Sequence, residues 1–313
     1  MLSAGPIGML HVTAANPEDR AALADVLDRS ARTDHALTWG GSGQIEGWAA
    51  RTRVLRVEAV VVGVTLFRSS PESPAASIRV ALAPEARDAA GAAAEALLTD
   101  ALVQGSHLGT ATLQLFAPAG ATWVGDPAKR QGFTKVRSIY RMLRPAVAGD
   151  PPALDPAAGL RIRELGPGED EAALQALNRA WRGTWNYHPI MADALARDLD
   201  GQRDGFLLAV PQNDPSRIVG TTHAIFDAQG KNPDGGPRAW ISNVTTDPDY
   251  RGRGIARKLL TAGLRSLRAR GAGSIGLGVD AGNEAPLRLY KSLGFDVSDV
   301  LDVWERAVEG SAH

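Results

Sequence analysis

Residues 243–256 combine a strand, a turn, a glycine-rich loop and a helix start in an order that suits anion binding. The β-branched segment around Val244 leads through a proline turn into the loop Arg251-Gly-Arg-Gly254, after which an apolar helical pattern begins. A glycine-rich turn that opens a helix presents unpaired backbone N–H groups and the positive end of the helix dipole to an anion. Arg251 and Arg253 add positive charges that suit phosphate. This segment therefore predicts a cradle for a pyrophosphate group.

The helix that follows must hold the cradle against a core, and its sequence is amphipathic. Apolar residues recur at helical spacing on one face, and basic residues occupy the opposite face. The apolar set is Ile255, Leu259, Leu260, Leu264 and Leu267, and the basic set is Arg257, Lys258, Arg265 and Arg268. Gly271 is typical of a residue that ends a helix, so we expect the helix to stop there.

A second motif lies downstream, and the two motifs together resemble a known superfamily. Residues 283–295 read Asn-Glu-Ala-Pro-Leu-Arg-Leu-Tyr-Lys-Ser-Leu-Gly-Phe. The spacing Arg251-x-x-Gly254-x-Ala256 resembles the coenzyme A motif of the GNAT superfamily of N-acetyltransferases, whose members carry an Asn, a helix and Tyr-x-x-Leu-Gly-Phe further on. Two ordered motifs with a matching gap are more specific than either alone. The loop has neither a Rossmann Gly-x-Gly-x-x-Gly nor a P-loop Gly-Lys-Ser/Thr.

The chain reads as two copies of one design on either side of a Pro- and Ala-rich linker. Each copy begins with a short strand, at residues 10–12 and 160–162, and continues with a helix and Val-rich strands at 57–67, 206–210 and 218–226. Pro84-x-x-Arg87 and Pro248-x-x-Arg251 lie 248 − 84 = 164 residues apart, and Gly132-Phe133 and Gly294-Phe295 lie 294 − 132 = 162 apart. Two landmarks with nearly the same offset argue for an internal duplication.

The resemblance implies an α/β fold of two tandem GNAT-like domains, each a mixed, mostly antiparallel sheet flanked by helices. We expect a degenerate, non-catalytic domain at 9–144, a linker at 145–158 and a catalytic domain at 159–308. The first copy has Ala90 where the second has Gly254, and a Cβ there hinders the approach of backbone to phosphate. Asp88 adds a repelling charge, and Ala128 replaces Tyr290. A structural role follows for the first copy, with a regulatory ligand or a share in the acceptor pocket as alternatives.

Composition limits the kinds of partner. The 313 residues are 44% hydrophobic and 22% charged, with a net charge of −1, which favours a globular protein and gives no electrostatic case for nucleic acid or an anionic membrane. The absence of cysteine excludes disulfides, thiolate metal sites and a cysteine nucleophile. The first ten residues do not resemble a signal peptide, and no apolar run is long enough to span a membrane. We expect a cytoplasmic protein without a metal.

The resemblance assigns residues to acetyl-CoA. The strand at Val244, Thr245 and Thr246 would hold the pantetheine arm through its backbone, and Arg251, Gly252, Arg253, Gly254, Ile255 and Ala256 would hold the pyrophosphate. Tyr290 matches the family's general acid for the leaving thiolate, and Asn283 matches a residue near the acetyl group. Their alternative roles are core packing for Tyr290 and a plain helix N-cap for Asn283.

The general base is not settled by the resemblance. Some family members use a Glu at the position of Gly278, which this chain lacks. Asp280 shares that strand face and is one candidate, against an alternative role in capping the strand end. His223 is another candidate because histidine titrates near neutrality. A water chain with no dedicated base is the third possibility.

The acceptor side is expected from the first helices of the second copy. We predict contacts from Trp185, Tyr187, His188 and Asn243. Trp181 and Trp185 are four residues apart, so the alternative is that both lie on one helical face and belong to the core. The predicted function is acetyl-CoA-dependent N-acetylation of a small amine or an amino terminus. The layout also resembles, at a distance, the mycothiol synthase family of actinobacterial tandem acetyltransferases, which acetylate a cysteinyl amine. A non-catalytic acyl-CoA sensor or scaffold is the alternative from another class, and no oligomeric state is predicted.

Overall fold

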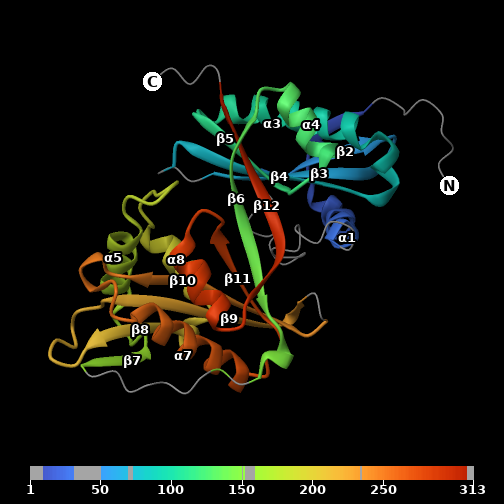
Figure 1. Cartoon of the computed structure of the whole chain (residues 1–313). Coiled ribbons are helices and arrows are strands. Elements are labelled where there is room, and N and C mark those ends of the chain that lie inside the picture. The colour runs from blue at the N-terminus through green and yellow to red at the C-terminus, as the bar shows by residue number, and fades with distance from the viewer. Residues whose placement is uncertain are drawn as a thin grey trace. The chain divides into compact units, whose positions relative to one another are not determined.

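The computed structural model describes residues 10–31, 51–69, 73–149, 151, 159–232 and 235–308, and these form two compact units (Figure 1). Unit 1 comprises Met1–Arg141, Asp280–Gly282 and Ser298–His313, and unit 2 comprises Met142–Val279 and Asn283–Val297. Residues 150 and 152–158 of the predicted linker lie outside the described residues. The unit division also differs from the sequence-based boundary at 308, because the last strand belongs largely to unit 1.

Unit 1 is built on a mixed sheet. Its strands are β1 (His11–Ala14), β2 (Arg53–Val57), β3 (Val60–Arg68), β4 (Ala75–Leu82), β5 (Thr112–Pro118), β6 (Thr134–Arg144) and β12 (Asp296–Ala307). Its helices are α1 (Arg20–Ala31), α3 (Ala90–His107) and α4 (Thr122–Arg130). Strands β1 to β4 pair antiparallel in order, β4 and β5 pair parallel, and β5 pairs antiparallel with β12.

Unit 2 repeats this topology. Its strands are β7 (Leu160–Glu164), β8 (Phe206–Pro211), β9 (Gly220–Lys231), β10 (Pro237–Thr246) and β11 (Ile275–Asp280). Its helices are α5 (Asp170–Trp181), α6 (Ala192–Leu199), α7 (Ile255–Ala269) and α8 (Glu284–Ser292). Three antiparallel pairs from β7 to β10 are again followed by a parallel pair, β10 with β11. The predicted fold class is confirmed.

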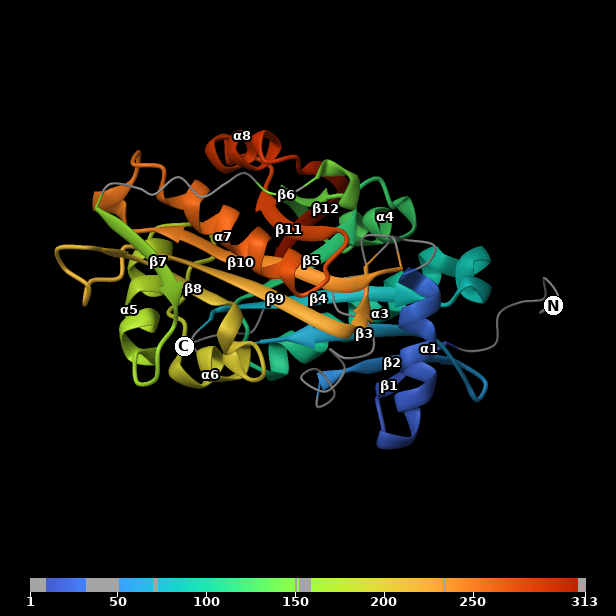
Figure 2. The ribbon, with the colours of Figure 1, turned by 90° about the horizontal axis from the view of Figure 1, so that it is seen from below.

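The sheet of unit 2 is covered on both faces, which explains why every residue of β8 is buried. Strand residues alternate between the two faces. Phe206 and Leu208 pack with the apolar sides of α5 and α6, whereas Leu207 and Ala209 pack with Ile255 and Leu259 of α7. Figure 2 shows α5 and α6 on one side of these strands and α7 on the other. The amphipathic α7 is thereby fixed so that its N-terminus lies at the end of β10.

The Val-rich strand segment predicted at 57–67 corresponds mostly to β3, which begins at Val60, whereas Val57 is the last residue of β2. The chain forms two strands there, β2 and β3, joined by a tight turn in which Val57 pairs with Val60. Glu58 takes the positive φ of 54° that the turn requires. Because Glu58 and Ala59 are not typical turn residues, the Val-rich composition hid the hairpin.

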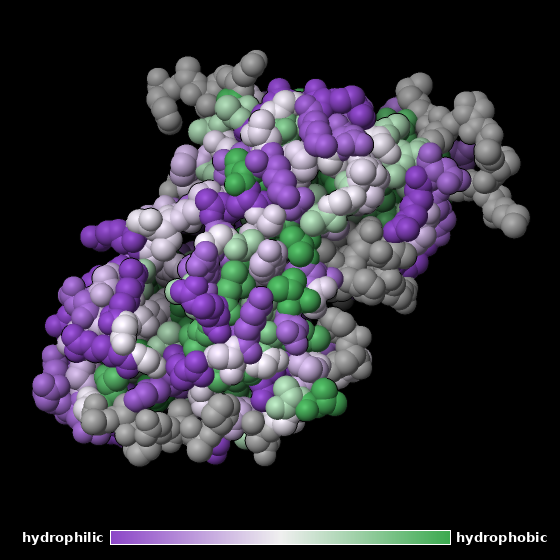
Figure 3. Space-filling view, in the orientation of Figure 1, coloured by the Kyte–Doolittle hydropathy of each residue, from purple (hydrophilic) through white to green (hydrophobic). Residues whose placement is uncertain are grey.

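Hydrophilic and hydrophobic residues are interspersed on the face drawn in Figure 3. Within the part of the chain that the structure describes, no helix is both long and apolar enough to cross a membrane.

Candidate functional site

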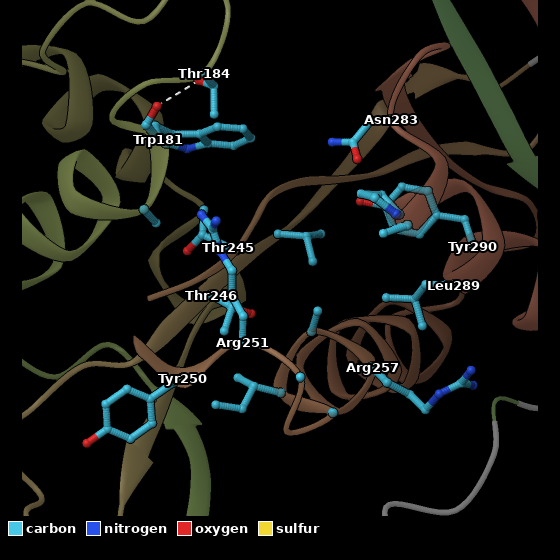
Figure 4. Close-up of a pocket in the computed structure, with 18 residues that line it drawn as sticks. Trp181, Thr184, Thr245, Thr246, Tyr250, Arg251, Arg257, Asn283, Leu289 and Tyr290 are labelled. Carbon is cyan, nitrogen blue, oxygen red and sulfur yellow. Dashed lines mark hydrogen bonds between the residues drawn. The ribbon is translucent and has the colours of Figure 1, made fainter. Parts of the chain in front are cut away.

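A cavity of about 570 Å³ lies in unit 2 where β10, α7, α8 and the end of α5 meet (Figure 4). Among the described residues that line it, the charged ones are Arg251 and Arg257, so the cavity is positive. The lining residues are Ala180, Trp181, Thr184, Val244, Thr245, Thr246, Tyr250, Arg251, Gly252, Gly254, Ile255, Ala256, Arg257, Asn283, Ala285, Pro286, Leu289 and Tyr290. One cavity thus brings together both sequence motifs.

One wall of the cavity is a strand edge that its neighbour leaves open. The parallel register of β10 with β11 covers Trp240 and Ile241, opposite Gly276 and Leu277. From Val244 to Thr246, β10 lines the cavity instead. Backbone N–H and C=O groups at such an edge need partners, and an extended amide-containing arm can supply them. This arrangement fits a pantetheine chain.

The loop after β10 forms the anion cradle, residues 251–256. Asp247 begins the turn by accepting a hydrogen bond from the Asp249 N–H at 3.0 Å. Gly252 and Gly254 have φ values of 78° and 74°, which favour glycine. A Cβ at either position would meet no described atom within 4 Å, so it would project into free space. The first turn of α7 directs its N–H groups into this space, and the cradle therefore fits a pyrophosphate.

The opposite wall carries the second motif. Asn283 precedes α8, yet in the described part of the chain its side chain makes no capping hydrogen bond, which leaves the amide free to serve the cavity. Tyr290 is 7% exposed, and its ring lies 6.2 Å from that of Phe295. Burial raises the pKa of Tyr290 to about 12. The phenol is thus protonated at physiological pH and able to donate a hydrogen bond.

The residues predicted for acetyl-CoA gather here with one exception. Val244 to Thr246, the cradle, Asn283 and Tyr290 line the cavity, but Arg253 does not appear among the described lining residues. Its guanidinium lies 4.7 Å from the Tyr250 ring centre and donates to the Asp249 carbonyl. Arg257 was assigned only to the polar face of the helix, yet it lines the cavity and donates to Ser292 Oγ at 2.7 Å. The position of Arg257 in the first turn of α7, close to the glycine-rich loop, is the sequence feature that could have indicated its place in the cavity.

Neither candidate base is among the described residues that line the cavity. Asp280 pairs with Arg137, and its other oxygen accepts the Gly282 N–H at 2.9 Å. His223 is 1% exposed, and its Nε2 donates to the Gln202 carbonyl at 3.1 Å. Burial lowers the pKa of His223, so its ring is neutral. The structure therefore does not bring either group to the reacting centre.

No predicted acceptor residue is among the described residues that line the cavity; the predicted set is Trp185, Tyr187, His188 and Asn243. Tyr187 reaches Asn178, and His188 contacts the Asn186 carbonyl. Asn243 lies at an irregularity of β10. Trp181 and Thr184 line the cavity instead, across from Asn283 and Tyr290 (Figure 4). Trp181 packs against the core beneath α5 and α6, as helical spacing predicted, and as the last residue of α5 it also lines the cavity.

The corresponding place in unit 1 is built differently. A 3-10 turn, Pro84–Ala89, runs directly into α3, and Ala90 has a helical φ of −54° with its N–H donating to Arg87 O. This N–H is used within the chain and is not offered to an anion. Trp123 stands where unit 2 has Ala285, at the offset of 162 residues, and the cavity here is only about 180 Å³. The geometry of a cradle is missing from this copy.

Comparison with known proteins gives consistent results. A model of the acetyltransferase (GNAT) family matches residues 171–295. A mycothiol acetyltransferase from Kocuria rhizophila is 32% identical over 240 residues, which cover 72% of this chain and 75% of that protein. One from Thermobispora bispora is 38% identical over 172 residues, 52% of this chain, and the match spans about half, 55%, of that relative.

Among solved structures, a tandem GNAT protein from the clavulanic acid biosynthesis pathway superposes with a TM-score of 0.72. The sequence identity is 16%, and the superposition covers 96% of this chain and 99% of that one. At this identity the likeness concerns the fold, and it extends over both units.

Gly254→Glu tests the cradle. The substitution strains a left-handed residue and places a carboxylate against the bound phosphates. We expect the coenzyme A affinity measured by calorimetry to fall by roughly 100-fold or more, since strain alone costs about 1–3 kcal/mol. Gly91→Glu is the matched control in the first turn of α3, where an added Cβ has open space, and it should bind as the unchanged protein does. Normal binding by Gly254→Glu would remove the cradle from the site.

Proposed function

The chain belongs to the GNAT family of acetyltransferases, and we propose that it transfers the acetyl group of acetyl-CoA to the amine of a small molecule in unit 2. One observation carries the proposal: a single positive cavity joins the anion cradle, the open edge of β10 and the hydroxyl of Tyr290. A binding protein would need the first two features. The phenol on the opposite wall is useful to a reaction.

The residues of the cavity have distinct roles in this proposal. Acetyl-CoA supplies an activated thioester whose coenzyme part departs as a thiolate. The N–H groups of the cradle and the guanidinium of Arg251 hold the pyrophosphate. The backbone of β10 from Val244 to Thr246 orients the arm, and the amide of Asn283 steadies its far end. Holding the reactants in line is itself a large share of such catalysis.

Tyr290 acts as a hydrogen-bond donor to the leaving sulfur. Its pKa is about 12, whereas an ordinary thiol has a pKa of about 8.5, a difference of 12 − 8.5 = 3.5. Full transfer of the phenol proton to the thiolate is therefore uphill by itself. The Tyr290 hydroxyl donates a hydrogen bond that stabilises the negative charge developing on the sulfur. The acceptor nitrogen loses one proton as the new bond forms, and this proton balances the charge of the departing thiolate.

Water is the route for that proton in our proposal. Both oxygens of Asp280 already accept hydrogen bonds, and His223 is a buried neutral ring held by Gln202. An acceptor amine that arrives neutral needs only a path to solvent. The side chains of Trp181 and Thr184 face Tyr290 across the cavity (Figure 4), and they form the wall against which the acceptor would lie.

The names of the relatives guide the choice of acceptor. Mycothiol acetyltransferases match this chain at moderate identity, so the cysteinyl amine of a small molecule is the first acceptor to test. An aromatic wall such as Trp181 offers an apolar face to such a molecule, and a small free amine or an amino terminus would fit the same wall.

Tyr290→Phe removes the proposed donor and keeps the ring packed on Phe295. Loss of one donor to developing charge lowers turnover by roughly 10²–10³-fold. Steady-state rates of acetyl transfer measure this, and calorimetry should give unchanged coenzyme A affinity. Tyr187→Phe is the control, because that phenol reaches Asn178 outside the cavity. Normal turnover by Tyr290→Phe would reduce Tyr290 to packing.

The pH profile tests the proton route. The rate should rise with pH and level off above the pKa of the acceptor amine, about 7.7–8.0 for an α-amine. Tyr290 stays protonated up to its pKa of about 12, so its ionisation does not lower the rate below that pH. Burial lowers the pKa of His223 below its ordinary value of 6.5, so loss of a proton from this ring does not raise the rate above pH 6.5. Asp280→Asn and His223→Gln should retain the same profile. A profile flattened by Asp280→Asn would identify that carboxylate as the base.

A further inference from the structure

Strand β10 contains a bulge at the point where it reaches the cavity. Ser242 pairs with His223 and Thr245 pairs with Thr221, so two residues of β10, Asn243 and Val244, lie opposite one residue of β9, Thr222. Asn243 absorbs the extra residue with a φ of 52°, unusual for a side chain other than glycine. A bulge breaks the regular ladder, so its backbone groups need other partners.

Two buried threonine hydroxyls supply those partners. Thr221 is 0% exposed and Thr245 is 5% exposed. The Thr221 N–H donates to Thr245 Oγ1 at 3.2 Å, the two hydroxyls are 2.7 Å apart, and Thr221 Oγ1 donates to the Asn243 carbonyl at 3.1 Å. Only one direction satisfies all three bonds. Thr245 must donate to Thr221, because Thr221 uses its single proton on the carbonyl.

This pair sets the direction of the next peptide group. Successive strand residues turn their N–H and C=O groups to opposite sides of the strand. The Thr221 hydroxyl holds the Asn243 carbonyl toward β9, and the next residue, Val244, lines the cavity at the open edge of β10. A Cβ on the neighbouring Gly220 would lie 2.8 Å from the Thr245 carbonyl, so β9 approaches the bulge closely and leaves it little freedom.

We propose that Thr221 and Thr245 are positioning residues for acetyl transfer, because their hydroxyl pair fixes the bulge that aims the Val244 backbone at the thioester. Neither side chain need touch the acceptor. The proposal rests on the proposed function and adds a specific cause for the orientation of the reacting group. It predicts that loss of the pair weakens the chemical step more than the binding of coenzyme A, since the cradle lies further along the chain.

Thr221→Val tests the proposal, because it keeps the shape of the side chain and deletes the hydroxyl. Thr222→Val is a matched control: Thr222 is also fully buried on β9, and it donates to the Ser242 carbonyl, before the bulge, at a longer 3.4 Å. We expect kcat to fall about 10-fold or more for Thr221→Val, with the KM for acetyl-CoA nearly unchanged, and normal kcat for Thr222→Val. Thr221→Ser should restore most of the rate. Equal losses in the two Val variants, or no loss in either, would overturn the proposal.

Amide hydrogen exchange over residues 242–246 gives a readout that does not need turnover. Thr221→Val should speed exchange there, and Thr222→Val should leave it unchanged. If the unaltered protein acetylates no amine, the proposed function fails while this exchange result still decides whether the hydroxyl pair holds the bulge. If the protein turns over and exchange is the same in both variants, the positioning role fails by itself. Should Thr221→Val not fold, Thr245→Ser and Thr245→Val provide the same comparison from the other hydroxyl.

Discussion

A strand that leaves its neighbour must find new partners for its backbone, and the site of this protein depends on that requirement. In the described part of the chain, β10 pairs with β11 through two of its residues, Trp240 and Ile241. Beyond them β10 offers an open edge to the cavity, and a bulge at Asn243 changes which groups face it. The fold supplies the rest: α7 continues from the end of β10, so its N-terminus and the open edge belong to one continuous surface.

The two units show what this arrangement requires in sequence. Both have three antiparallel pairs followed by a parallel pair. In unit 2 the turn before the helix ends in Gly254 with a left-handed φ, which leaves its N–H groups available. In unit 1 the chain coils through a 3-10 turn into Ala90, and the bulk of Trp123 stands near the helix start. The same topology therefore carries the glycine-rich loop geometry in unit 2 and a different turn in unit 1, because a few local residues differ.

Local chemistry made much of this predictable. The glycines of the cradle and the amphipathic α7 are short-range patterns that predict the place of the candidate anion site. The α/β fold followed from the family resemblance of the two motifs, and the duplicated landmarks indicated the two copies. The hydroxyl pair could not be read in advance, because Thr221 and Thr245 are 24 residues apart and meet only through the register of two strands. Helical spacing placed Trp181 toward the core, against which it packs, but it could not show that α5 ends at this residue and that the ring also lines the cavity. The candidate bases were chosen by strand face and titration range, and neither property reveals that Asp280 is paired with Arg137.

The central claim is that unit 2 alone carries the coenzyme site. Amide hydrogen exchange followed along the whole chain, with and without coenzyme A, tests it most directly, since it maps binding without assuming which unit responds. The account predicts slower exchange at residues 244–256 and 283–290 when coenzyme A is present, with residues 84–94 of unit 1 unchanged. Protection of residues 84–94, alone or together with unit 2, would contradict it.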